Sequence, residues 1–165
     1  MPDIPIPPSV TQFYGPFNLK QLLASIRGWL QDAGYEVIEP SYKHKVGGEG
    51  AELEVKMDGE RKQTHYAKFK INVELKISDM KDVEVVRDGE KVKMQHGRIQ
   101  ATLAGVVELD YQKRFEGNAF LEGLRDFYHK YIIKETIENV YWDNVHTTIF
   151  KLQRFIRDSL QFEAH

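Results

Sequence analysis

The chain has 165 residues and a mass of 19.2 kDa, of which 41% are hydrophobic and 29% charged, a composition typical of one folded domain and not of a disordered chain. A formal net charge of −2, from 23 basic and 25 acidic residues, excludes an overall positive field that would attract a polyanion or an anionic membrane. The absence of cysteine excludes disulfides and thiolate chemistry.

The start of the chain and its apolar runs indicate the cellular compartment. The N-terminal sequence Met1-Pro2-Asp3-Ile4 lacks the basic region and the apolar stretch of a signal peptide. The uninterrupted apolar runs are far shorter than the roughly 20 residues that a membrane-spanning helix needs. We therefore expect a cytoplasmic protein without a membrane span.

Residues 1–17 are rich in proline and precede a single predicted domain over residues 18–165. Five of the six prolines lie in this segment, spaced by apolar residues such as Ile6 and Phe13. This pattern favours an extended N-terminal arm of polyproline character. Two placements are open, because the arm can pack along its own domain or reach a neighbouring subunit.

A helix is predicted directly after this arm. Asn18 is a good N-cap, Leu22, Ile26 and Leu30 follow the helical period of 3.6 residues, and Gly34 is placed to end the helix. The helix therefore has one apolar face, which we expect to be buried.

The apolar pattern then changes to a period of two, which predicts four antiparallel strands. Two strands flank a glycine-rich turn at residues 47–50, and a long strand over residues 67–85 has its apolar residues at odd positions. Asp88-Gly89 is a strong hairpin signal, after which the apolar residues change from even to odd positions. We therefore predict a β-bulge at residues 96–98, where Gly97 can adopt the required conformation.

The register that follows from this bulge places charges of opposite sign on facing residues of the two long strands. Such cross-strand pairs stabilise a sheet and support the register. The predicted pairs are Glu84 with Lys93, Lys70 with Glu108, and Lys68 with Asp110.

The last part of the chain, from the predicted N-cap Asn118 to about residue 160, has a helical pattern without proline. Two forms are open, one long helix or two helices with a bend near Ile133. Its length matches that of the long strands, so we expect it to lie along their apolar face. The predicted fold class is α+β, an antiparallel four-stranded β-meander in the order α-β-β-β-β-α with the N-terminal helix and the C-terminal helix on one face.

No motif in the sequence supports a catalytic, cofactor or metal site. Asp143 and His146 have the spacing of a metal-binding pair on a helix, as do Asp126 and His129, but the glutamates that complete a di-iron site are missing. No nucleophile elbow is present, and the glycine-rich turn is followed by a strand, whereas a phosphate site needs a helix N-terminus. We expect no catalytic residue, cofactor or metal, and an enzyme that uses scattered carboxylates ranks low among the hypotheses.

Nucleic acid is not expected as a partner either. Lys68 and Lys70 stand opposite acidic residues in the predicted register. A surface that follows a phosphate backbone needs positive charge that is not neutralised in this way. Nucleic-acid binding is therefore kept only as the third function.

Aromatic residues in the C-terminal helical stretch exceed what one buried face requires. Trp142, Phe127, Phe150 and Phe155 lie outside or at the margin of the predicted buried stripe. Either the first helix and the N-terminal arm cover them, or they form an interface in which aromatic anchors contribute much of the binding energy. Our first hypothesis is a non-enzymatic structural or protein-interaction domain that forms a homo-oligomer or binds a protein partner.

The second hypothesis is a binding module for an apolar or lipid-like small molecule between the sheet and the C-terminal helix. The pocket would be lined by Phe69, Ile71, Leu103, Tyr128 and Tyr131. A core packed to native density in this place would exclude it.

Several short segments together resemble a group of small archaeal proteins of unknown function, and the resemblance covers most of the chain. It implies no activity and no site residue. The segments are Pro7-Pro8-Ser9, Phe13-Tyr14-Gly15-Pro16, Tyr42-Lys43-His44-Lys45, Val83-Glu84-Val85-Val86 and Val107-Glu108-Leu109-Asp110-Tyr111. In shape, a curved antiparallel sheet closed over a long C-terminal helix is also similar to helix-grip ligand-binding folds, which have more strands and a different helix order.

Overall fold

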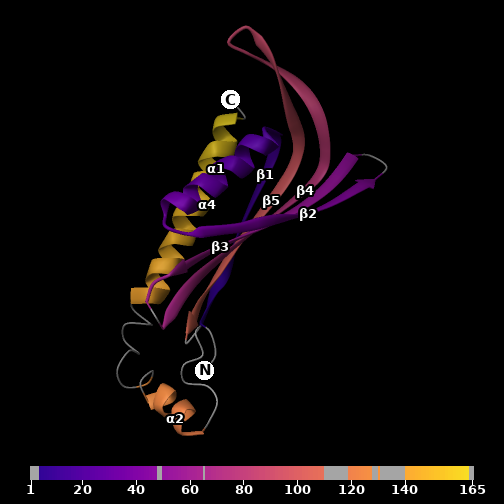
Figure 1. The fold of residues 1–165 in the computed structure, drawn as a ribbon. Coiled ribbons are helices and arrows are strands. Elements are labelled where there is room, and N and C mark those ends of the chain that lie inside the picture. The colour runs from indigo at the N-terminus through magenta and orange to yellow at the C-terminus, as the bar shows by residue number, and fades with distance from the viewer. Residues whose placement is uncertain are drawn as a thin grey trace.

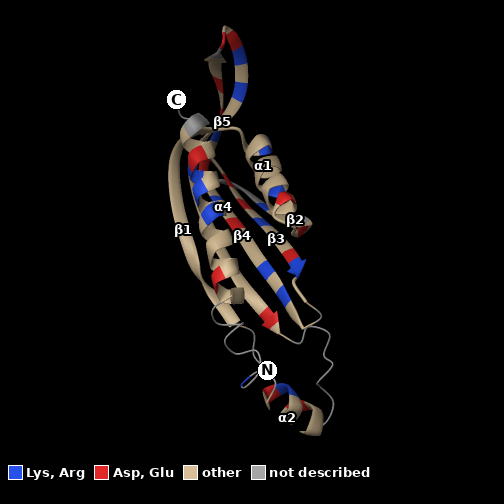
Figure 2. Ribbon diagram, turned by 90° about the vertical axis from the view of Figure 1, so that its left-hand side faces the viewer, with Lys and Arg blue, Asp and Glu red and all other residues tan. Residues whose placement is uncertain are grey.

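The computed structural model describes residues 4–47, 50–64, 66–109, 119–127, 130 and 140–163. They form an α+β fold in which a five-stranded antiparallel sheet, in the order β1-β5-β4-β3-β2, carries α1 and α4 on one face (Figures 1 and 2). We call the opposite face the outer face. The elements are β1 (Ile4–Phe17), α1 (Leu19–Asp32), β2 (Glu36–Gly47), β3 (Gly50–Lys62), β4 (Ala67–Arg87), β5 (Glu90–Leu109), α2 (Ala119–Phe127) and α4 (Trp142–Glu163). Within these described ranges, no helix has the length and apolar character needed to cross a membrane.

The predicted N-terminal arm forms strand β1, which adds a fifth strand at one edge of the sheet. β1 pairs with β5 from Ile4 opposite Val107 to Phe17 opposite Gln95, so the prediction of a four-stranded meander is wrong. Proline-rich segments suit polyproline structure, but an edge strand bonds on one side only and tolerates residues that lack an amide hydrogen. The register shifts between Ile6 and Ser9, where Pro7 and Pro8 lie.

Both edges of the sheet have features that discourage the addition of another strand. β1 carries Pro5, Pro7, Pro8 and Pro16 at one edge. β2, at the other edge, contains Pro40 within a register shift between Ile38 and Ser41. Prolines and irregular pairing remove the continuous row of donors and acceptors that a new strand needs. Association by extension of the sheet is therefore disfavoured at both edges.

The first helix forms where the sequence predicts it. The Asn18 side chain accepts a hydrogen bond from the backbone N–H of Gln21 at 3.0 Å, as expected of an N-cap. Leu22, Ile26 and Leu30 are buried, which confirms the apolar face. Gly34 follows with a φ of 92°, a left-handed conformation that glycine adopts without strain.

A β-bulge lies opposite Gly97, as predicted, but the extra residue is in β4 and not in β5. Ser78 faces Arg98 and Lys81 faces His96, so three steps along β4 correspond to two along β5. A Cβ atom at position 97 would lie 2.8 Å from the carbonyl oxygen of Ser78. Glycine is therefore required here by a close backbone contact, which the sequence pattern alone does not reveal.

This difference shifts the register of the long hairpin. Glu84 faces Lys93, as predicted, but Glu108 faces Lys68 and not Lys70. Lys70 still reaches Glu108 as a diagonal neighbour, with Nζ and Oε2 2.8 Å apart. Asp110 lies outside the described residues.

The bulge also exchanges the two faces of the hairpin beyond it. Val83 pairs with Met94, and Val85 with Val92. His96 contacts Tyr14 on the outer face, and side chains alternate along β5, so Met94 and its partners also point to the outer face. The prediction that Val83 and Val85 share the buried face of β4 is therefore wrong. We call residues 81–96 the projecting hairpin. At its base the Gln95 side chain accepts a hydrogen bond from the backbone N–H of Leu19 in α1, and its tip extends past the helices (Figure 1).

The core lies between the sheet and α4. Residues of α4 at helical spacing are buried against β1, β4 and β5, namely Val145, Ile149, Leu152, Ile156 and Leu160. Of the predicted C-terminal helical stretch, α4 packs on the apolar face, as predicted, whereas α2 lies beyond the end of the sheet (Figure 1). The structure describes α2 and α4 as separate helices, and both Asn118 and the predicted bend near Ile133 lie outside the described residues.

Tyr35 adds a pH-dependent contribution to stability. Its side chain is buried, and this burial raises its pKa from 10.0 to about 12, although the positive charge of Arg61 acts in the opposite direction. The unfolded state loses the hydroxyl proton of Tyr35 at a lower pH than the folded state does. We therefore expect the free energy of unfolding to keep this contribution below pH 10 and to fall, by up to about 3 kcal/mol, as the pH rises toward 12. Tyr35→Phe should remove this part of the decline, as measured by urea unfolding at pH 9 and pH 11.5. Equal declines in both proteins would contradict the assignment.

Candidate functional site

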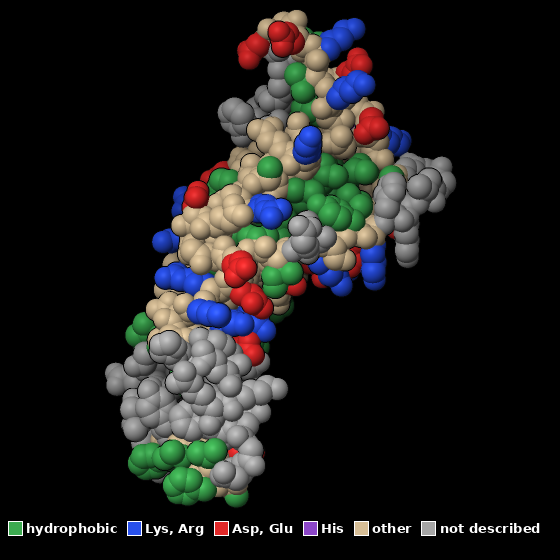
Figure 3. Space-filling view, viewed as in Figure 1, with side chains coloured by type: hydrophobic (Ala, Val, Ile, Leu, Met, Phe, Trp, Pro, Cys, Tyr) green, Lys and Arg blue, Asp and Glu red, His purple; other side chains and the backbone are tan. Residues whose placement is uncertain are grey.

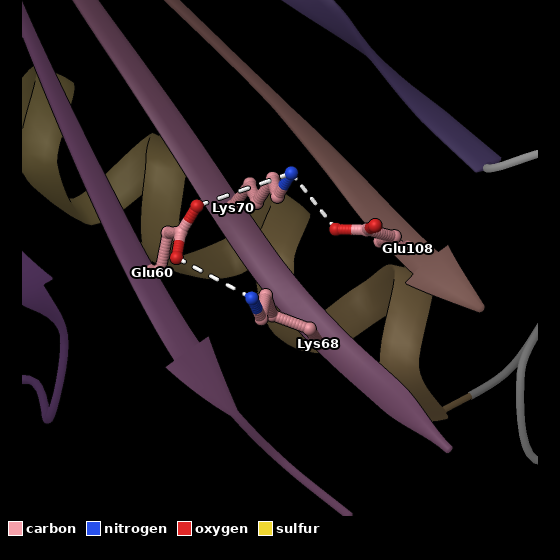
Figure 4. Close-up of polar contacts among 4 residues, drawn as sticks. All are labelled: Glu60, Lys68, Lys70 and Glu108. Carbon is pink, nitrogen blue, oxygen red and sulfur yellow. Dashed lines mark hydrogen bonds and ion pairs between the residues drawn. The ribbon is translucent and has the colours of Figure 1, made fainter. Parts of the chain in front are cut away.

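The outer face has two halves with different electrostatic character. In the half formed by β3, β4 and the end of β5, charges are paired (Figure 4). Glu60 lies between two lysines, 3.4 Å from Lys68 and 3.9 Å from Lys70, and Lys70 also contacts Glu108. The sequence-based expectation of a neutralised lysine surface therefore holds for this half.

The other half, over β1, β5 and β4, contains a polar groove of about 570 Å³. It is lined by Gln12, Phe13, Tyr14, Lys76, Ser78, Arg98, Ile99 and Gln100. Cross-strand pairing explains how these residues meet, because Gln12 faces Gln100 and Tyr14 faces Arg98 across β1 and β5. On the other side of β5, Gln100 faces Lys76 and Arg98 faces Ser78. We call this the polar groove.

The helix-side face of the sheet continues beyond the helices as an open apolar surface. Tyr42 faces Val55, Leu53 faces Ile77, and Ala51 faces Met80, which places all of them on the face that also carries the core. Tyr42 is 55% exposed, and Leu53 and Met80 are partly buried. Figure 3 shows hydrophobic side chains gathered below the projecting hairpin and beside the β2–β3 hairpin. We call Tyr42, Ala51, Leu53 and Met80 the open sheet patch.

An apolar groove, which we call the helix groove, is lined by the end of β1, by α1 and by the C-terminal half of α4. Its volume is about 350 Å³, and its lining includes Phe17, Leu22, Phe155 and Leu160 with a polar rim that contains Asp158. The groove differs from the predicted ligand pocket, because its lining includes none of Phe69, Ile71 and Leu103.

The residues predicted to line an apolar pocket belong to the core where they are described. Phe69, Ile71 and Leu103 have no exposed surface, and the Phe69 ring packs edge-on against Tyr141 with centroids 5.5 Å apart. Tyr128 and Tyr131 lie outside the described residues.

The four aromatic residues predicted for an interface are not brought together. Phe127 is exposed on α2, and Phe150 is exposed on α4. Phe155 is partly buried with its ring 6.4 Å from that of Trp29 of α1, so the first helix covers it. Trp142 is partly buried, and its ring stacks on His146 with centroids 4.7 Å apart.

No protein-family model matches the sequence, and no curated protein matches it. Among the residues that the structure describes, no group of three or more His, Asp or Glu side chains is placed to hold a metal ion. The surfaces themselves therefore provide the evidence for function.

Sequence reasoning missed both the polar groove and the open sheet patch. Tyr14 and Arg98 become neighbours only because residues 4–17 form a strand beside β5. The alternation of Val10, Gln12 and Tyr14 on one side with Thr11 and Phe13 on the other was a signal for that strand, masked by the prolines.

Proposed function

We propose that this protein is a non-enzymatic interaction domain that self-associates by docking the projecting hairpin of one copy on the open sheet patch of a second copy. One observation carries the proposal. The bulge in β4 turns the apolar side of the projecting hairpin, where Val83, Val85 and Val92 are partly exposed, away from the helix-side face of its own sheet, whereas Met94 at the base of this row is buried. That apolar row therefore cannot cover the open sheet patch of the same chain.

The low stability expected of the projecting hairpin on its own supports a second copy as its partner. A two-stranded hairpin with little packing is marginally stable in water, and beyond the buried Met94 this one extends past α1 and α4 with valines that are partly or fully exposed. A second copy offers an apolar surface of the same character, the open sheet patch, around Tyr42 and Leu53. Two such contacts related by a twofold axis form a closed dimer. The blunted sheet edges agree with association through side chains and not through strand addition.

The experiment measures the subunit number by native mass spectrometry and the dimer Kd by analytical ultracentrifugation. We expect the wild-type protein at twice 19.2 kDa. Tyr42→Asp should raise the dimer Kd at least about 30-fold, as expected for the loss of a central aromatic anchor. Ile38→Asp is the matched control, because Ile38 is 45% exposed on the same strand but is not on the patch face, and it should leave the Kd unchanged.

The hairpin offers a second matched pair. Val85→Lys should weaken the dimer, whereas Val86→Lys should not, because Val86 is 68% exposed and alternation places it on the other face. Mixing the Tyr42→Asp and Val85→Lys proteins should restore a mixed dimer, since one contact is then wild type and the other pairs opposite charges. A monomeric wild type at high concentration, or a dimer that survives Tyr42→Asp, would contradict the proposal.

The helix groove favours a second candidate function, the binding of an apolar small molecule. A lining of Phe17, Leu22, Phe155 and Leu160 around about 350 Å³ provides an apolar site of ligand size. The native mass spectrum separates the two functions. A monomer that carries a discrete additional mass would favour ligand binding over self-association.

A further inference from the structure

The polar groove concentrates positive charge on a protein whose overall charge is slightly negative. Lys76 and Arg98 line it, and its described lining residues include no Asp or Glu. Lys76 has two acidic neighbours, because it faces Glu54 across β3 and β4 and its Nζ lies 3.6 Å from Oε1 of Glu74. This lysine side chain is exposed, so these interactions are weak, and Arg98 is the principal cation of the groove. The other half of the outer face differs, because Glu60 and Glu108 neutralise Lys68 and Lys70 there.

Arg98 is held in position before any ligand arrives. Its guanidinium carbon lies 5.7 Å from the centre of the Tyr14 ring, and the same ring makes an edge contact with His96 at 5.1 Å. A guanidinium that packs on an aromatic ring loses less conformational entropy when it binds an anion. Its planar guanidinium donates two parallel hydrogen bonds to a phosphate or carboxylate, so this side chain binds such anions selectively.

The rest of the groove suits the uncharged part of such a ligand. Gln12, Gln100 and Ser78 supply amide and hydroxyl groups that both donate and accept hydrogen bonds, as sugar hydroxyls require. Tyr14 is 65% exposed and presents an aromatic surface at the margin of the groove. The volume of about 570 Å³ lies within the usual range for small-molecule sites.

From this combination we infer that the polar groove binds a small hydroxylated organic phosphate, such as a nucleotide or a sugar phosphate. Arg98 and Lys76 hold the phosphate, and the two glutamines and Ser78 bind hydroxyl groups. A nucleic-acid strand is disfavoured, because it needs a continuous basic track with several aromatic platforms, and the neighbouring half of this face is neutralised. This site shares no residue with the open sheet patch, and Tyr14 at its margin contacts His96 at the base of the projecting hairpin; phosphate binding does not require the proposed self-association.

Isothermal titration calorimetry tests the site with the full chain and four probes: AMP, ribose 5-phosphate, adenosine and a single-stranded oligothymidylate. We expect AMP, ribose 5-phosphate or both to bind, and adenosine to bind at least about 30-fold more weakly than AMP because it lacks the phosphate. Binding of AMP alone, with a loss of affinity in Tyr14→Ala, would identify a nucleotide. Equal binding of both phosphates would identify a sugar phosphate.

Variants locate the binding. Arg98→Glu should lower the affinity for the bound phosphate at least about 30-fold, and Arg98→Lys should lower it less, since the charge remains but the planar guanidinium is lost. Lys56→Glu is the matched control, because Lys56 is an exposed lysine of β3 outside the groove, and it should leave the affinity unchanged. Equal unfolding midpoints would show that the variants are folded. Absence of binding by both phosphates, equal affinity in Arg98→Glu, or a clear preference for the oligothymidylate would overturn the inference.

Discussion

Phe69→Ala should destabilise the protein by about 3–5 kcal/mol, the usual cost of removing a fully buried phenylalanine and leaving a cavity. Phe69 has no exposed surface, and its ring contacts Tyr141 at 5.5 Å. Urea unfolding followed by circular dichroism measures the change. Phe150→Ala is the matched control, because Phe150 is 57% exposed on α4, and we expect it to change stability by less than about 0.5 kcal/mol.

The same substitution separates a core from a ligand pocket. If Phe69 lined a pocket that holds an apolar molecule, its removal would weaken ligand binding and leave the ligand-free protein nearly as stable as before. An unfolding free energy that stays within about 1 kcal/mol of the wild type would therefore contradict the assignment of Phe69 to the packed core.

Gly105→Val should destabilise the protein by about 3 kcal/mol, because β5 and α4 approach closely at this residue. A Cβ atom at position 105 would lie 2.8 Å from Cδ1 of Ile149 and 2.9 Å from the carbonyl oxygen of Lys70. The Ile149 methyl group can rotate away, but the carbonyl oxygen of Lys70 belongs to the backbone and cannot move without disturbing the β4–β5 pairing. The measurement is the unfolding free energy from urea titration.

Gly28→Val provides the control for this effect. Gly28 lies within α1, and nothing is within 4 Å of a Cβ atom placed there. Valine and glycine have similarly poor helix propensities, so we expect a change of less than about 0.5 kcal/mol. A Gly105→Val protein as stable as the Gly28→Val protein would show that α4 does not pack as closely on β5 as described.

Local patterns predicted most of the elements. The Asn18 cap and the spacing of Leu22, Ile26 and Leu30 identified α1, since both signals lie within a few residues of one another. Asp88 and Gly89 have φ values of 51° and 80°, as the predicted two-residue hairpin turn requires. The alternation of apolar and polar residues predicted β2 to β5, since this signal also lies within a few neighbouring residues. The candidate surfaces were less accessible, because they combine residues from several strands.

Sequence by itself therefore determined the α+β class, the first helix, the long hairpin and the packing of the C-terminal helix on the apolar face. Only the tertiary structure decided that residues 4–17 join the sheet beside β5, and that the extra residue of the bulge lies in β4. The reason is that a strand signal states which residues alternate, whereas the choice of partner and register depends on contacts between distant segments. The extra residue in β4 shifts the register by one, which places Val83 and Val85 on the outer face. The pairing of β1 with β5, which the sequence did not predict, places Tyr14 beside Arg98.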